Sequence, residues 1–498
     1  MTLLKRTFTG FLWNSAGKML EYLLLYVITV FIARGLGLYQ NGTYATLMSF
    51  AQIVLVLSSM GLETALNKAL PQIEGPAAPS RIRFVLLRAL GTRIAVFILI
   101  AAILLVAIKV LHLTSAASLS EYLLLLLVYA CVRSITTLVS TSMTALFRTD
   151  IVSIVGVGMR AIELTIIAVL SAGGLSIHAL LILFSLTGTF QIVLSLLLLR
   201  RSLLGGLTSQ SLRPLFVFGA VYWINSIVDY FLGRHGDVLL LATLTSDSSQ
   251  ASTYDVSFSL VQLASMALTL GFGGITFATF ARLALGPAPA FDQFYAFLLR
   301  ILSFLTIPLF AFLAFNAGPI ISLLYSPAFG GALGLVQGMV VFKIGSRLFG
   351  GGVNTEYLLA RGRVGWVSSA GVAAAGLNIV LDVMLIPPFG AFGAVLGSGC
   401  ANLLVNALTR ILVGRYSKIP LPFASWTKMT VAALPMSWIV AVLFSSDDPI
   451  SLLSRIGVFG VGIILLTAIL KPFNRDDLMV LAEASPWLAG RVQFIAAR

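Results

Sequence analysis

Charged residues are scarce in this chain of 498 residues, and acidic residues are the scarcest of them. Lys, Arg, Asp and Glu together make up 10% of the sequence, whereas a soluble globular protein carries about 25%. Hydrophobic residues make up 59%. This composition excludes a soluble globular protein and indicates an integral membrane protein. Because the apolar runs are continuous and do not alternate, we expect membrane-spanning helices and not the strands of a barrel.

Cysteine and histidine are also rare. The two cysteines, Cys131 and Cys400, both fall within predicted spans, and the three histidines lie at predicted span ends. No disulfide framework and no metal-ligand spacing can be built from these residues. We therefore expect no metal site and no other cofactor.

The short motifs that mark many enzymes are missing as well. The chain has no Gly-x-x-x-x-Gly-Lys-Ser/Thr loop for ATP, no His-Glu-x-x-His and no Gly-x-Ser-x-Gly. The connections between apolar runs are too short to hold an extramembrane domain. We therefore expect that the chain is not an enzyme.

What the chain has is a series of long apolar runs. A spanning helix needs about 20 mostly apolar residues, and fourteen runs qualify. They lie near residues 8–33, 43–66, 86–110, 121–146, 151–172, 177–199, 214–236, 252–277, 297–324, 331–358, 364–386, 390–413, 428–446 and 449–470. The predicted fold class is therefore all-α, a polytopic membrane protein with about 14 transmembrane helices. We expect two six-helix lobes, residues 1–210 and 211–420, then two extra helices in 421–472 and a cytoplasmic tail in 473–498.

A weak internal repeat, offset by 210 residues, supports the two lobes. Residues 40–52 and 250–262 share five polar identities in thirteen positions. At the same offset Arg133 falls on Lys343, and each lies in a long apolar run. The alternative is chance similarity between apolar segments. Related halves are how many transporters build one site near the middle of the bilayer.

The predicted loops differ in their basic residues. If the N-terminus is cytoplasmic, the cytoplasmic segments hold twenty Lys and Arg residues and the outer segments hold three. The positive-inside rule then places both termini in the cytoplasm. This bias also accounts for most of the net charge of +14, so no nucleic-acid partner is expected.

Eight ionisable residues remain well inside predicted spans. A charge at the bilayer centre costs roughly 2.5–3.5 kcal/mol on insertion scales, so these residues are expected to face a water-filled interior or one another. They are Lys18, Glu21, Arg133, Arg160, Glu163, Asp229, Lys343 and Arg347.

Four of these residues form two pairs at i,i+3 spacing, Lys18 with Glu21 and Arg160 with Glu163. Residues three apart meet on one helix face, so each pair can neutralise itself. The sequence leaves open whether the pairs are structural or functional.

Lys343 and Arg347 pose a different problem, because like charges at i,i+4 repel. Glu356 is nine positions beyond Arg347, so no acid lies one turn away on the same helix. We expect the compensating anion to come from another helix, such as from Asp229 or Glu21, or from a ligand.

The charge pattern separates ordinary interfacial acids from two sets of candidate functional residues. The acids Asp237, Asp255 and Asp382 lie close enough to predicted span ends to be ordinary interfacial residues. The bases predicted to line a cationic substrate cavity are Arg133, Lys343, Arg347, Lys18 and Arg160. The acids predicted as candidates for ion coupling are Glu21, Asp229 and Glu163.

Several degenerate motifs, in order along nearly the whole chain, give a family resemblance. The sequence resembles Wzx-type polysaccharide flippases, of the multidrug/oligosaccharidyl-lipid/polysaccharide exporter superfamily. The resemblance rests on residues 34–37, 42–45, 61–66, 323–329, 377–387 and 390–394. None of the Arg or Lys candidates sits in a motif specific enough to be carried over from the family.

The resemblance implies a two-lobed helical bundle in the bacterial cytoplasmic membrane. Such a protein moves undecaprenyl-diphosphate-linked oligosaccharide to the outer leaflet by alternating access, with a groove beside the two extra helices for the lipid tail. The implied partners are the lipid-linked oligosaccharide and the bilayer, with a glycan polymerase and glycosyltransferases of the same pathway as candidates. The alternatives are a drug/cation antiporter of the same superfamily, a membrane glycan polymerase and a scaffold without transport activity. Neither the glycan nor the coupling ion follows from the sequence.

Overall fold

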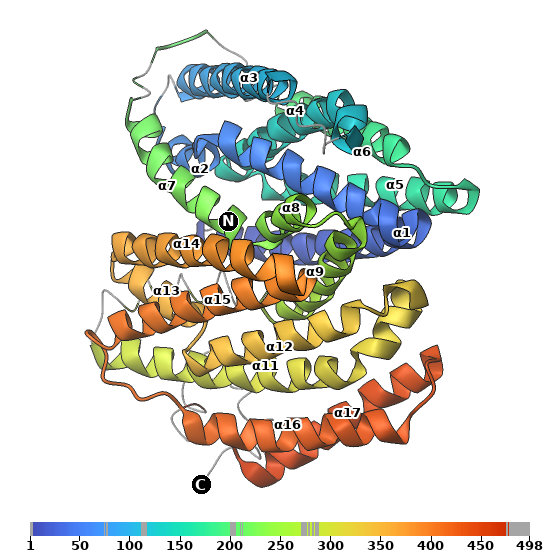
Figure 1. Cartoon of the computed structure of the whole chain (residues 1–498). Coiled ribbons are helices and arrows are strands. Elements are labelled where there is room, and N and C mark those ends of the chain that lie inside the picture. The colour runs from blue at the N-terminus through green and yellow to red at the C-terminus, as the bar shows by residue number, and fades with distance from the viewer. Residues whose placement is uncertain are drawn as a thin grey trace. The chain divides into compact units, whose positions relative to one another are not determined.

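The structure is a computed structural model that describes residues 3–73, 75, 78–110, 117–199, 206–209, 211, 213–269, 276, 279–280, 283, 288–474 and 477. These residues are mainly α-helical (Figure 1), so the predicted all-helical class is confirmed. The chain divides into two compact units. Unit 1 comprises Met1–Ala242 and Ser246–Ser252, and unit 2 comprises Thr243–Thr245 and Thr253–Arg498.

The helices follow the apolar runs closely. The first group comprises α1 (Leu3–Ser59), α2 (Leu62–Ala69), α3 (Ala78–Val110), α4 (Ala117–Ala145), α5 (Thr149–Gly173), α6 (Ile177–Leu199), α7 (Arg213–Phe231) and α8 (Arg234–Leu244). The second group comprises α9 (Ser248–Thr269), α11 (Ala288–Leu324), α12 (Ala332–Leu348), α13 (Gly352–Ala360), α14 (Val364–Phe389), α15 (Ala391–Val413), α16 (Phe423–Leu443) and α17 (Pro449–Leu470). Short 3₁₀ turns occupy Leu70–Gln72 and Pro327–Phe329.

Helix α1 contains the first predicted span and most of the second, which continues into α2. Its 57 residues would extend about 85 Å as one straight helix, against about 30 Å for the hydrocarbon core of a bilayer. Gly37, with φ 72° and ψ 177°, breaks the helical geometry, and a glycine accepts this backbone conformation without a Cβ clash. The predicted spans at 8–33 and 43–66 therefore lie on either side of one glycine kink.

The exact number of fourteen spans is not confirmed. Within the described residues, ten helices are long and apolar enough to cross a membrane, or up to twelve if each of two bent pairs is one span. One pair joins Leu215–Phe231 to Arg234–Leu244, and the other joins Ala332–Leu348 to Gly352–Ala360 with a bend of 40°. The second pair corresponds to the single span predicted at 331–358.

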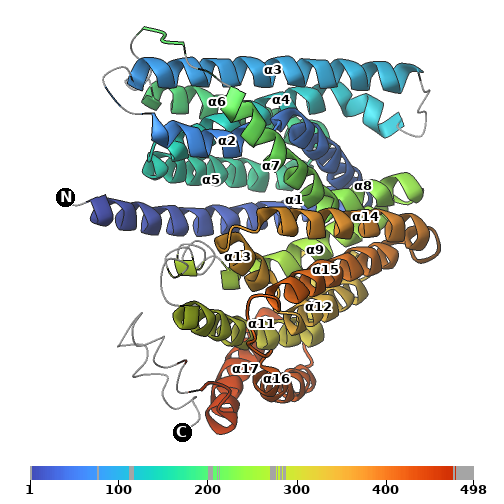
Figure 2. The same ribbon diagram turned by 90° about the vertical axis from the view of Figure 1, so that its left-hand side faces the viewer.

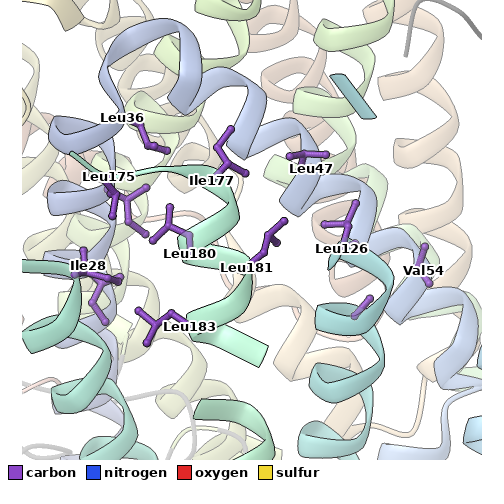
Figure 3. Close-up of a cluster of buried hydrophobic side chains, with 14 of the residues drawn as sticks. Ile28, Leu36, Leu47, Val54, Leu126, Leu175, Ile177, Leu180, Leu181 and Leu183 are labelled. Carbon is purple, nitrogen blue, oxygen red and sulfur yellow. The ribbon is translucent and has the colours of Figure 1, made fainter. Parts of the chain in front are cut away.

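The core of unit 1 is an apolar cluster built largely by α1, α4 and α6 (Figure 3). Ile28, Leu36 and Leu47 of α1 meet Leu180 and Leu181 of α6, and all five are at least 92% buried. Helix α7 also packs on α1 and α2, although the repeat predicts it as the first helix of the second lobe. The predicted domain limits remain a prediction.

Unit 2 is organised around α11, which packs against α12 and α16, while α14 and α15 run side by side (Figures 1 and 2). The two extra helices are bonded to this frame, since the Trp426 indole donates a hydrogen bond of 2.8 Å to Ser303 of α11. Two described residues after α17 also contact α11. Phe473 stacks near Phe304, and the Arg300 guanidinium binds Asp477 at 2.6 Å.

Candidate functional site

The predicted site residues belong to both units, and each group is described within its own unit. In unit 1 three helices bring together a buried charge cluster. Arg160 of α5 pairs with Glu163 one turn along the same helix, and its Nε lies 3.8 Å from a carboxylate oxygen of Glu21 on α1. Thr187 of α6 donates a hydrogen bond of 2.8 Å to Glu163. The cluster contains two acids and one base, so it carries one net negative charge when all three are ionised.

Close helix packing makes this cluster possible. A Cβ on Gly17 of α1 would lie 2.5 Å from the Cβ of Ser153 on α5, which is too close for any larger residue without movement. A Cβ on Gly156 would lie 3.3 Å from a carboxylate oxygen of Glu21. The two glycines therefore let α1 approach α5 closely enough for Glu21 to reach Arg160.

The pairings expected from helix spacing are only half right. The Arg160–Glu163 pair is present and buried, with side chains 9% and 6% exposed. The Lys18–Glu21 pair is not found in the described part of the chain. Lys18 is exposed, and Glu21 pairs instead with Arg160 from another helix.

Two further candidates of unit 1 stand apart from this cluster. Arg133 of α4 is partly buried and takes part in no ion pair within the described residues of unit 1. Asp229 of α7 is exposed. Arg133 therefore remains a cation without internal compensation in its own unit.

One buried ion pair of unit 1 was missed in the sequence. Arg93 of α3 is 2% exposed, and its Nη2 lies 3.0 Å from a carboxylate oxygen of Glu63 on α2. The same guanidinium donates a hydrogen bond to Ser134 of α4. The sequence carried a signal for this pair, because Arg93 lies seven residues inside the predicted span at 86–110. Through these two contacts Arg93 connects α3 to both α2 and α4.

In unit 2, Lys343 and Arg347 continue the buried face of α12. They follow Val336 and Val340 at helical spacing, and both are themselves partly buried. The charged neighbour of Lys343 among the described residues of unit 2 is Arg347, which repels it. Lys343 is thus the counterpart of Arg133, a span cation with no acid partner among the described residues of its own unit.

The acid near Arg347 comes from another helix, as expected, but it is Glu356, which its distance along the sequence had set aside. Glu356 of α13 interacts electrostatically with Arg347, and Thr276 donates a hydrogen bond to Glu356. The bend between α12 and α13 explains the error. Gly350 and Gly351 adopt φ values of 94° and 56°, so nine positions of sequence do not run along one straight helix.

Asp382 is not the interfacial residue that its position near a span end suggested. It is 0% exposed within α14 and accepts a hydrogen bond of 3.1 Å from Asn378. Helix α15 covers it, because a Cβ on Gly397 would lie 2.2 Å from its carboxylate oxygen. Asp237 of α8 is likewise 0% exposed. The burial of these two acids could not be inferred from how close they lie to a loop in the sequence.

Comparison with known proteins places this arrangement in a family. Residues 31–332 match the family described as "Polysaccharide biosynthesis protein". The structure of "Lipid II flippase MurJ, inward closed conformation" aligns with a TM-score of 0.67 and 14% identity, over 92% of this chain and 98% of that one. An inward-facing multidrug resistance MATE transporter of the MOP superfamily aligns with a TM-score of 0.62 and 13% identity, over 80% and 94%. A search of curated proteins finds no match.

These findings bear out the predicted recognition and multi-pass membrane character. The two solved structures, of a flippase and a transporter, share the fold of this chain. The family match extends over more than half of the sequence. The chain therefore belongs to the polysaccharide biosynthesis protein family and is a multi-pass membrane protein with the fold of MurJ and the MATE transporters.

Proposed function

We propose that this protein translocates undecaprenyl-diphosphate-linked oligosaccharide from the inner to the outer leaflet of the bacterial cytoplasmic membrane by alternating access. One observation carries the proposal. Arg133 and Lys343, which the repeat pairs, are both partly buried cations of spanning helices without an acid partner in the described residues of their own units. The distribution of basic residues supports cytoplasmic termini.

The chemistry of the cargo matches these cations. A diphosphate bearing a glycan cannot cross about 30 Å of hydrocarbon unaided. Guanidinium and ammonium groups bind phosphate oxygens through charge-assisted hydrogen bonds. Since each uncompensated cation is costly in the membrane, an anionic cargo lowers that cost while it is bound. The other three predicted bases are weaker candidates, because Arg160 and Arg347 have acids nearby and Lys18 is exposed.

Among the predicted coupling acids, Glu21 fits the role of proton or cation carrier best. Glu163 is held by Arg160 and by Thr187, and its side chain is 6% exposed. The Glu21 side chain is 35% exposed and contacts Arg160 only at 3.8 Å. Fewer and longer contacts therefore hold the Glu21 carboxylate than hold that of Glu163. Asp229, exposed on α7, is the second choice.

The test is a variant with both Arg133→Gln and Lys343→Gln, expressed in a strain that lacks the native gene. We expect surface polysaccharide to fall at least about tenfold, because one bidentate or charge-assisted phosphate contact is worth about 1.5–3 kcal/mol. Lipid-linked oligosaccharide should accumulate in the inner leaflet. Arg88→Gln, which removes an exposed cation of α3, is the matched control. Undiminished export by a well-inserted double variant would refute the proposal.

A drug/cation antiporter is the second candidate, because the MATE transporter shares the fold. It predicts that deletion sensitises cells to cationic dyes while surface polysaccharide is unchanged. A membrane polymerase predicts that oligosaccharide reaches the outer leaflet but stays short. A glycan polymerase and glycosyltransferases of the same pathway are the proposed partners, and co-purification with the wild-type protein tests them.

A further inference from the structure

Two loops of unit 2 present a group of cationic and aromatic side chains that the transport proposal does not use. One loop joins α13 to α14 and the other joins α15 to α16. The six residues, named here the basic–aromatic patch, are all exposed. They are Arg361, Arg363, Trp366, Arg415, Tyr416 and Lys418.

The patch is held together by reciprocal stacking between the loops. The Cζ of Arg363 in the first loop lies 5.2 Å from the ring centre of Tyr416 in the second. The Cζ of Arg415 in the second loop lies 5.4 Å from the ring centre of Trp366 at the start of α14. Each side of the patch therefore supplies one cation and one ring, and the two cation–ring contacts connect the α13–α14 segment to the loop after α15.

Contacts with buried residues of unit 2 also hold both loops. The Arg410 guanidinium of α15 donates hydrogen bonds to the Ile419 carbonyl at 2.7 Å and to the Tyr295 hydroxyl at 3.1 Å. Arg361 lies over the Phe291 ring, with its Cζ 4.5 Å from the ring centre. The patch is thus a fixed surface, and little side-chain entropy remains to be lost when it binds a ligand.

The charges of the patch have no ion-pair partner in the described part of the chain. Within the described residues, no ion pair involves its four cations, and residues 361–366 and 414–420 contain no acid. A guanidinium stacked on a ring keeps its N–H donors in the plane of the group, where they can form a fork with phosphate oxygens.

One loop follows the candidate span α15, and the other follows the bent pair of α12 and α13, so we infer that the patch lies at the level of the lipid headgroups. Trp and Tyr side chains favour this layer, and each Lys or Arg near an anionic membrane surface strengthens binding about fivefold. We propose that the basic–aromatic patch binds the phosphate groups of anionic phospholipids in the leaflet on its side, predicted to be the cytoplasmic one. This inference is independent of the cargo that the protein moves.

The experiment compares two variants with the same loss of charge. Arg363→Gln with Arg415→Gln removes the two stacked cations, and Arg148→Gln with Arg213→Gln removes two exposed cations of unit 1. The full-length protein in dodecyl maltoside is titrated with dioleoyl phosphatidylglycerol, dioleoyl phosphatidylcholine or inorganic phosphate, and bound lipid is counted by native mass spectrometry. We expect wild type to bind phosphatidylglycerol in preference to phosphatidylcholine. The patch variant should need at least tenfold more phosphatidylglycerol, and the control variant should match wild type.

Several outcomes would overturn the proposal. Equal phosphatidylglycerol binding by the two double variants would refute the lipid site. An acidic protein found on the patch would not rescue it. Competition by millimolar inorganic phosphate would assign the site to free phosphate and not to a lipid. If the patch variant fails to fold, Lys418→Gln replaces it, because Lys418 forms no ion pair or ring contact in the described structure. This variant should weaken phosphatidylglycerol binding about fivefold, and no change would refute the assignment.

Discussion

Replacing Arg160 should lower the free energy of unfolding measurably. Its guanidinium balances Glu163, whose side chain is 6% exposed and also accepts a hydrogen bond from Thr187. Breaking a buried ion pair by removing one partner costs about 3–5 kcal/mol, because the other charge stays buried without compensation. The side chains are too deeply buried for solvent screening to reduce this value strongly. We therefore expect Arg160→Met to lower the free energy of unfolding by about 3–5 kcal/mol.

A double-mutant cycle separates this charge effect from lost packing. Replacing a buried pair with neutral groups of similar volume is often close to neutral, so Arg160→Met with Glu163→Gln should recover most of the loss. Unfolding in mixed micelles is followed by tryptophan fluorescence, with Arg88→Met as an exposed control. The reasoning fails if the single variant loses less than about 1 kcal/mol, the size of an exposed pair. It also fails if the double variant is less stable than the single one.

Two further predictions concern helix packing and a helix cap. Gly397→Ala should lower the free energy of unfolding by about 1–3 kcal/mol, because its Cβ would lie 2.2 Å from the Asp382 carboxylate; Gly376→Ala, with open space around it, should leave stability unchanged or raise it, and equal effects would contradict the packing argument. The Asp448 carboxylate caps α17, and hydrogen bonds from the Ser446 hydroxyl and from the backbone N–H three residues on lower its pKa. A carboxylate whose pKa is lowered in the folded state stabilises the fold at pH values above its unfolded pKa of about 3.9. This stabilisation is lost as the pH falls through the folded pKa. The advantage of wild type over Asp448→Ala in thermal unfolding should therefore be constant near neutral pH and shrink below about pH 4, and a constant advantage down to pH 2 would refute it.

Sequence spacing predicts contacts within one helix, but not contacts between helices. The Arg160–Glu163 pair follows from i,i+3 geometry within one helix, and the structure contains it. The partner of Glu21 does not follow from spacing, because it depends on how closely α1 approaches α5 through Gly17 and Gly156. Inferring the Lys18–Glu21 pair from spacing alone assumed that the nearest opposite charge in sequence is the nearest in space.

The sequence by itself determined the class of protein, because an apolar run of spanning length and a lack of charge leave no alternative to membrane helices. It also identified several of the charged residues within the spans, although it missed Arg93 and misjudged Asp382. Only the tertiary structure decided which of those charges are neutralised. The backbone bend at Gly350 and Gly351 gives Arg347 the acid Glu356, whereas Lys343 obtains none in the described residues of its unit. The physical reason is that hydropathy sums over a segment of sequence, while an ion pair depends on the separation of two atoms in space.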